Sequence, residues 1–152
     1  MNQNQKTIGK FLFTGDWPEE ILPTIEALSQ EFQWLVPLWC HVVTVTWRPD
    51  IDAAMDCELE ADYRRFRLRV GADFFDDSPD HRRQCFIHEL LHGFILPLES
   101  YATDSVERLL PDDDDNRLKD VILEEIRERN EQVTEDLAFC LNQWLANHKT
   151  TP

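Results

Sequence analysis

Two histidines and a glutamate within five residues, His88, Glu89 and His92, form the part of this chain best suited to chemistry. On an α-helix, residues four apart lie on the same face, so the imidazoles of His88 and His92 can hold one metal ion. Glu89 lies beside them, where its carboxylate can hold a water molecule bound to that metal. The pattern His-Glu-x-x-His therefore predicts a zinc hydrolase site with Glu89 as general base.

A catalytic zinc site needs a third protein ligand and an open fourth position for water. His81 lies seven residues before His88, two helical turns away, which is too far to reach the same ion. We therefore expect an acidic residue from the C-terminal part of the chain. Glu131 and Glu135 stand one helical turn apart, with Glu131 as the ligand and Glu135 supporting a ligating histidine.

This choice of third ligand leaves alternatives open. The helical wheel places Glu131 and Glu135 at one margin of a broad apolar stripe, while Asp136 and Glu125 flank the other margin. Glu135 is the first substitute as metal ligand, and Asp136 and Glu125 could compete with both.

The motif must lie on a helix that begins near residue 79. Ser78 is a favourable N-cap and Pro79 suits the first helical position, and apolar residues then surround most of the helix. We expect Pro97 to end this buried helix. Residues 97–115 are predicted to be a loop, a possible lid in which Tyr101 could be an aromatic anchor. The aspartates at 112–115 suit the start of the next helix better than a calcium loop, since an EF-hand needs alternating ligands and a glycine.

The remaining elements are predicted from their periodicity. A long amphipathic helix is expected over 116–147, and a helix over about 17–34 that begins at Asp16 or Trp17. Strands are expected at 39–47, 55–61 and 63–70. In the last strand apolar residues alternate with three arginines, 65, 67 and 69. We favour solvated charges at a sheet edge for these arginines over an anchor for an acidic partner or for the aspartate run.

Composition excludes several classes of protein. A length of 152 residues with 42% hydrophobic residues predicts one folded domain, spanning 1–152. With 30 acidic against 15 basic residues the net charge is −15, which disfavours nucleic acid and anionic membranes as partners. The chain shows no signal peptide or membrane-spanning run, so we expect a soluble, cytoplasmic protein. The four cysteines form no C-x-x-C pair and are expected to be buried, reduced thiols. The sequence does not indicate an oligomeric state.

The His-Glu-x-x-His motif and the acidic pair Glu131 and Glu135 together resemble the gluzincin branch of zinc metallopeptidases. His88-Glu89-Leu90-Leu91-His92 followed by the run from Glu131 to Ala138 is similar to small metallopeptidases encoded by phages and prophages. The resemblance covers residues 63–141 in layout, and Glu135 stands where the gluzincin pattern usually has aspartate.

The resemblance implies an α+β fold of the minimal zincin type. In such a core, a small antiparallel sheet packs on the motif helix and a long C-terminal helix, and a peptide or protein substrate lies along an edge strand such as 63–70. Zn²⁺ would be the cofactor. The alternative is a catalytically silent, metal-stabilised binding protein, for example a phage protein acting on a host protein, since the chain is small and strongly acidic.

Overall fold

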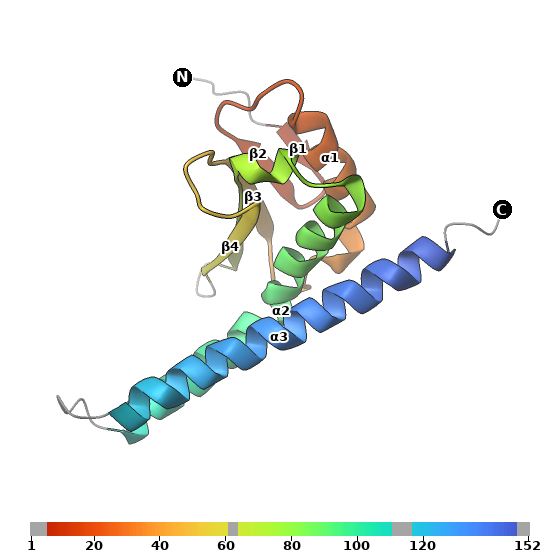
Figure 1. Cartoon of the computed structure of the whole chain (residues 1–152). Coiled ribbons are helices and arrows are strands. Elements are labelled where there is room, and N and C mark those ends of the chain that lie inside the picture. The colour runs from red at the N-terminus through yellow and green to blue at the C-terminus, as the bar shows by residue number, and fades with distance from the viewer. Residues whose placement is uncertain (1–5, 61–63, 111–116, 149–152) are drawn as a thin grey trace.

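The computed structural model describes residues 6–60, 64–110 and 117–148. Within these residues the chain forms an α+β fold: a five-stranded sheet with three α-helices (Figure 1). The strands are β1 (Lys6–Ile8), β2 (Phe11–Thr14), β3 (Val42–Trp47), β4 (Met55–Glu60) and β5 (Arg65–Val70). The helices are α1 (Leu22–Glu31), α2 (Pro79–Leu109) and α3 (Arg117–His148), with short 3₁₀ turns η1 (Gln33–Leu35) and η3 (Ala72–Phe75).

The sheet is mixed, so the expected antiparallel sheet is wrong. Its strand order is β1-β2-β3-β5-β4; β2, β3 and β5 run parallel, while β1 and β4 are antiparallel to their neighbours. The parallel pairing of β2 with β3 follows from α1, which carries the chain back between them. The hairpin of β1 and β2 was not predicted from the sequence.

Strand β5 confirms the predicted alternation but not its predicted place. Phe66, Leu68 and Val70 are fully buried on one face of the sheet. Yet β5 lies between β3 and β4, so it is not an edge strand, and β4 is the outermost strand on this side. The prediction that substrate could lie along an edge formed by 63–70 is therefore wrong.

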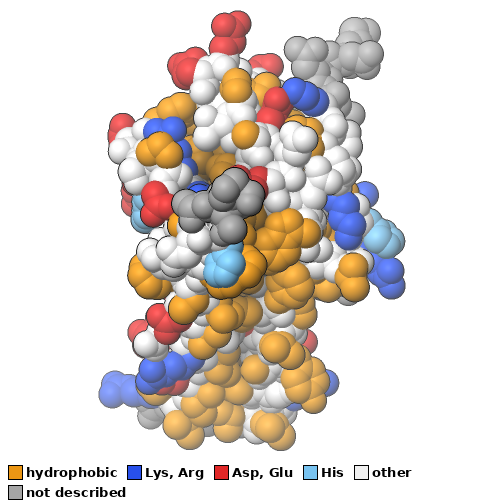
Figure 2. Space-filling view, turned by 90° about the vertical axis from the view of Figure 1, so that its right-hand side faces the viewer, with side chains coloured by type: hydrophobic (Ala, Val, Ile, Leu, Met, Phe, Trp, Pro, Cys, Tyr) orange, Lys and Arg blue, Asp and Glu red, His pale blue; other side chains and the backbone are white. Residues whose placement is uncertain are grey.

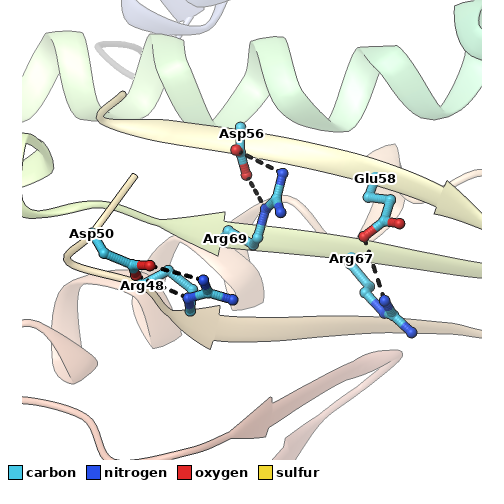
Figure 3. A network of polar contacts seen from close by, with 6 residues as sticks. All are labelled: Arg48, Asp50, Asp56, Glu58, Arg67 and Arg69. Atoms are coloured by element: carbon cyan, nitrogen blue, oxygen red, sulfur yellow. Dashed lines mark hydrogen bonds and ion pairs between the residues drawn. The ribbon is translucent and has the colours of Figure 1, made fainter. Parts of the chain in front are cut away.

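The arginines of β5 are paired with acids of β4 on the other face of the sheet (Figure 3). Arg69 donates two hydrogen bonds to Asp56, at 2.6 and 2.8 Å, and Arg67 contacts Glu58 and Glu60. Directly opposed charges of opposite sign stabilise a strand pair by roughly 0.2–1 kcal/mol. These arginines thus hold two strands together, which neither of the two interpretations of the arginine stripe anticipated.

Helix α1 begins later than expected, at Leu22, and ends at Glu31 before η1. Residues Asp16 and Trp17 do not cap it; the N-cap is Ile21, without a side-chain hydrogen bond. The Trp17 indole instead donates to the Thr14 carbonyl at 3.1 Å. Trp17 therefore stabilises the turn that follows β2 and not the start of α1. The helix has Pro23 in its first turn.

Helix α2 begins as predicted, because the Ser78 hydroxyl accepts a hydrogen bond from the His81 N–H at 3.2 Å. It does not end at Pro97, however, but continues to Leu109. Residues 97–109 are therefore helical, not the predicted lid loop, and Tyr101 is exposed on α2. The aspartate run at 112–115 lies outside the described residues.

A tryptophan explains why α2 passes through Pro97. Proline has no N–H, so it cannot bond the Gly93 carbonyl one turn earlier. The Trp39 indole donates to that carbonyl at 3.1 Å. A side chain at position 93 would meet Pro37 at 2.8 Å, so only glycine lets the segment containing Pro37 and Trp39 approach α2 this closely.

Helix α3 confirms the predicted C-terminal helix and packs along α2 as a long antiparallel hairpin (Figure 1). The first half of α2 and helix α1 cover the apolar face of the sheet, where Phe86 of α2 lies against Phe11 of β2 and Phe32. The second half of α2 extends past the sheet with α3. No helix in the described part of the chain is long and apolar enough to cross a membrane.

Candidate metal centre

The two motif histidines lie on the buried half of α2, and their Nε2 atoms point toward each other. The Nε2 atoms of His88 and His92 are 3.0 Å apart, and their side chains are 16% and 7% exposed. Their spacing of four residues on an α-helix brings the rings together, as expected. The apolar residues that flank them, Ile87 and Leu90, are fully buried and fix the helix on the sheet.

Glu131 of α3 completes a group of three ligating side chains. Its two carboxylate oxygens lie 3.5 Å from His88 Nε2 and 3.5 Å from His92 Nε2. The two helices approach closely here because Thr134 and Ala138 of α3, both fully buried, are small at the contact. The structure therefore brings together the three residues that the sequence selected as ligands.

The spacing of these donor atoms fits a zinc ion. With zinc–ligand bonds of about 2.1 Å, the edges of a coordination tetrahedron are roughly 3.4 Å long. The two Nε2 atoms are 3.0 Å apart, and each lies 3.5 Å from one oxygen of the Glu131 carboxylate, Oε2 for His88 and Oε1 for His92; these separations are close to that edge. Two imidazoles and one carboxylate also match the donor set of catalytic zinc sites, which leave a fourth position for water.

Glu135 lies behind His88, away from the other ligands. Its carboxylate is 3.0 Å from His88 Nδ1 and also accepts a hydrogen bond from Gln84 at 2.7 Å. A carboxylate on Nδ1 fixes the ring orientation and leaves Nε2 free to ligate. Glu131 therefore lies at the two Nε2 atoms and Glu135 at Nδ1 of His88, as expected for a ligand and a supporting residue.

The competing acids do not reach the histidines. Asp136 is exposed on α3, and Glu125 pairs with Arg129 at 2.7 Å. Neither belongs to a cluster of potential metal ligands among the described residues. Asp136 and Glu125 are therefore excluded as the third ligand, and of the four acids that the helical wheel left open only Glu131 and Glu135 remain.

Glu89 is buried beside this group and is suited to proton transfer. Its side chain is almost fully enclosed, and burial raises the pKa of its carboxyl to about 7, while a hydrogen bond from the Cys57 thiol opposes the rise. A general base works best when its pKa is near the working pH. Glu89 can therefore both take up and release a proton near neutrality.

Cys57 is a site residue that the sequence analysis missed. It lies on β4, and its thiol, the Glu89 carboxylate and a His92 ring nitrogen lie within 4.8 Å of one another. Of the four thiols that were predicted to be buried, only Cys40 is; Cys57 and Cys85 are partly exposed and Cys140 is exposed, although all four cysteines are free. The only signal for Cys57 was its alternation with Met55 and Leu59, which placed it on the inner face of its strand.

A cavity of about 210 Å³ opens beside the candidate metal centre. Its walls include Met55 at the start of β4, His88 and Glu89 of α2, and Glu135 of α3. Larger hollows of about 610 and 490 Å³ lie at the far end of the α2–α3 hairpin and between α1 and the start of α2, away from the histidines. The smaller cavity is thus the one from which a ligand would reach the centre.

Comparison with models of known protein families, with curated proteins and with solved structures finds no match. The interpretation of the centre therefore depends on its own geometry and on the two motifs.

Proposed function

We propose that this protein is a zinc-dependent metallopeptidase of the gluzincin type. The observation that carries the proposal is the convergence of His88 Nε2, His92 Nε2 and the Glu131 carboxylate within 3.5 Å of one another, with Glu89 buried beside them. Each residue of this group belongs to one of the two sequence motifs, at 88–92 and 131–138.

The chain's own residues divide the work of hydrolysis among them. When bound, zinc supplies Lewis acidity, which acidifies water and polarises a carbonyl group. Glu89 would accept the proton of the attacking water and transfer it to the leaving amine, a role that suits a carboxyl whose pKa is raised by burial. Glu135 holds the His88 ring through Nδ1, so that Nε2 keeps its lone pair for the ion.

Strand β4 is the best candidate for binding an extended peptide. It is the last strand of the sheet and pairs with β5 on one side, and no other strand in the described part of the chain pairs with its second edge. Cys57 on β4 touches Glu89, which places this strand next to the catalytic carboxylate. A peptide added to the edge of β4 would use main-chain hydrogen bonds, and its scissile bond would pass the centre.

Substitution of Glu89 tests the proposal. We expect the zinc-loaded protein to cleave an unstructured peptide library, scored by mass spectrometry. Glu89→Gln should lose on the order of 10²- to 10⁴-fold in rate, because the general base is removed, while it retains zinc. Glu128→Gln is the matched control, since Glu128 is exposed on α3 and belongs to no group of potential metal ligands among the described residues.

Two results would count against the proposal. A Glu89→Gln protein as active as the wild type would show that cleavage does not use this carboxylate. A wild type that holds zinc but cleaves no member of the library would instead favour the silent, metal-stabilised binding protein, and a partner captured equally well by Glu89→Gln would identify its role.

A further inference from the structure

A second group of metal-ligating side chains lies at the start of α2. Asp77, His81 and Cys85 follow one another at intervals of four residues, so His81 and Cys85 share a helix face and Asp77 precedes the Ser78 cap. A carboxylate oxygen, a ring nitrogen and the thiol sulfur of these residues all lie within 4.8 Å of one another. The distance from Asp77 Oδ1 to His81 Nε2 is 3.7 Å.

The group is open to solvent and continuous with the cavity beside the candidate metal centre. The side chains of His81 and Asp77 are 54% and 28% exposed, so an ion could enter directly. His81 and Cys85 also line the cavity of about 210 Å³ that reaches His88 and Glu135. These side chains therefore form part of the wall of that cavity, next to His88 on the same helix.

Local charge favours a cation at this wall. The carboxylates of Asp77, Glu89 and Glu135 are all close enough to Cys85 to act on its thiol electrostatically. A bound divalent ion would offset part of this negative charge.

The second group cannot share an ion with the first. His81 and His88 are seven residues apart on a continuous helix, which corresponds to roughly 10 Å along its axis. Paired metal ions that act together on one substrate atom lie only about 3.5–4 Å apart. Any ion held by His81 and Cys85 is therefore separate from one held by His88 and His92.

We propose that Asp77, His81 and Cys85 form a second binding site for a divalent transition-metal ion, with zinc as the natural occupant. A thiolate and an imidazole select zinc over magnesium or calcium, which prefer oxygen ligands alone. The ion links Asp77, which precedes α2, to Cys85 in the second turn of the helix. It also places positive charge on the wall of the cavity that opens beside the candidate metal centre.

Metal content and cobalt spectroscopy test the second site in the full-length, reduced protein. We expect two zinc ions per chain after metal-free protein is reloaded, and one in Cys85→Ser and in His81→Ala. His81 is exposed, so its replacement leaves the core intact. Cobalt in place of zinc should give a thiolate-to-metal charge-transfer band that Cys85→Ser abolishes. Cys140→Ser and Cys57→Ser are matched controls that should keep the band, the second because Cys57 adjoins only the first centre.

The outcomes separate this inference from the proposed function. A wild type with one zinc that Cys85→Ser removes would support the second site and overturn the peptidase centre. A wild type with one zinc that persists in Cys85→Ser and His81→Ala would overturn the second site and leave the peptidase centre standing. A cobalt–thiolate band that depends on Cys57 and not on Cys85 would also overturn it.

Discussion

The two halves of α2 differ sharply, although they belong to one continuous helix. The first half, up to residue 95, carries the buried residues Phe86, Ile87, Glu89, Leu90, His92 and Gly93. In the second half, Leu98, Tyr101 and Leu109 are 71%, 70% and 80% exposed. Hydrophobic side chains accordingly gather on the lower part of the molecule, where α2 and α3 run together (Figure 2).

The difference shows what positions the candidate metal centre. The first half of α2 is held by the sheet, by Phe32 and by α3, whereas the second half contacts α3 past the end of the sheet (Figure 1). Side chains packed on several sides keep one rotamer, as a metal site requires. The two candidate ligands of the centre on α2, His88 and His92, lie in the half that has this support.

The largest expected effect is the loss of unfolding free energy when a side chain in the first half of α2 is removed, compared with one in the second half. Phe86 is fully buried, with its ring 6.0 Å from that of Phe11 and 6.1 Å from that of Phe32. We expect Phe86→Ala to lower the free energy of unfolding by about 3–5 kcal/mol, measured by chemical denaturation. Tyr101→Ala, in the exposed half, should stay within about 0.5 kcal/mol of the wild type. Similar losses of unfolding free energy in Phe86→Ala and Tyr101→Ala would contradict the claim that only the first half of α2 is packed into the core.

A smaller effect is expected where the two halves meet. Trp39→Phe keeps an aromatic ring but removes the donor to the Gly93 carbonyl, and should cost about 1–3 kcal/mol in unfolding free energy. In a Pro97→Ala background the same change should cost less, because alanine at position 97 supplies its own N–H to that carbonyl. A double-mutant cycle with equal costs in both backgrounds would show that Trp39 does not compensate for Pro97.

Local sequence signals predicted the elements that carry the site. Ser78 and Pro79 marked the start of α2, and the alternation of Phe66, Leu68 and Val70 marked β5. The spacing of His88 and His92 put both rings on one face. Helical geometry is short-range, so these features can be read from neighbouring residues.

Long-range contacts account for what the sequence did not reveal. The donor that lets α2 pass Pro97 comes from Trp39, 54 residues before the carbonyl that it bonds. The contact of Cys57 with Glu89 joins a strand to a helix. The parallel direction of β2 and β3 likewise depends on the path of α1. The spacing of residues along the chain does not predict contacts between segments far apart in the sequence. Glu131 and Glu135 could be selected because their own spacing matches one helical turn.

The most direct measurement for the central claim is anomalous diffraction at the zinc edge from crystals of the zinc-loaded protein. We predict an anomalous peak for one zinc ion coordinated by His88 Nε2, His92 Nε2 and the Glu131 carboxylate. A water molecule should hold the fourth position, and the Glu135 carboxylate should contact His88 Nδ1. The absence of a peak between these side chains, or an ion closed off by four protein ligands, would contradict the proposed peptidase centre.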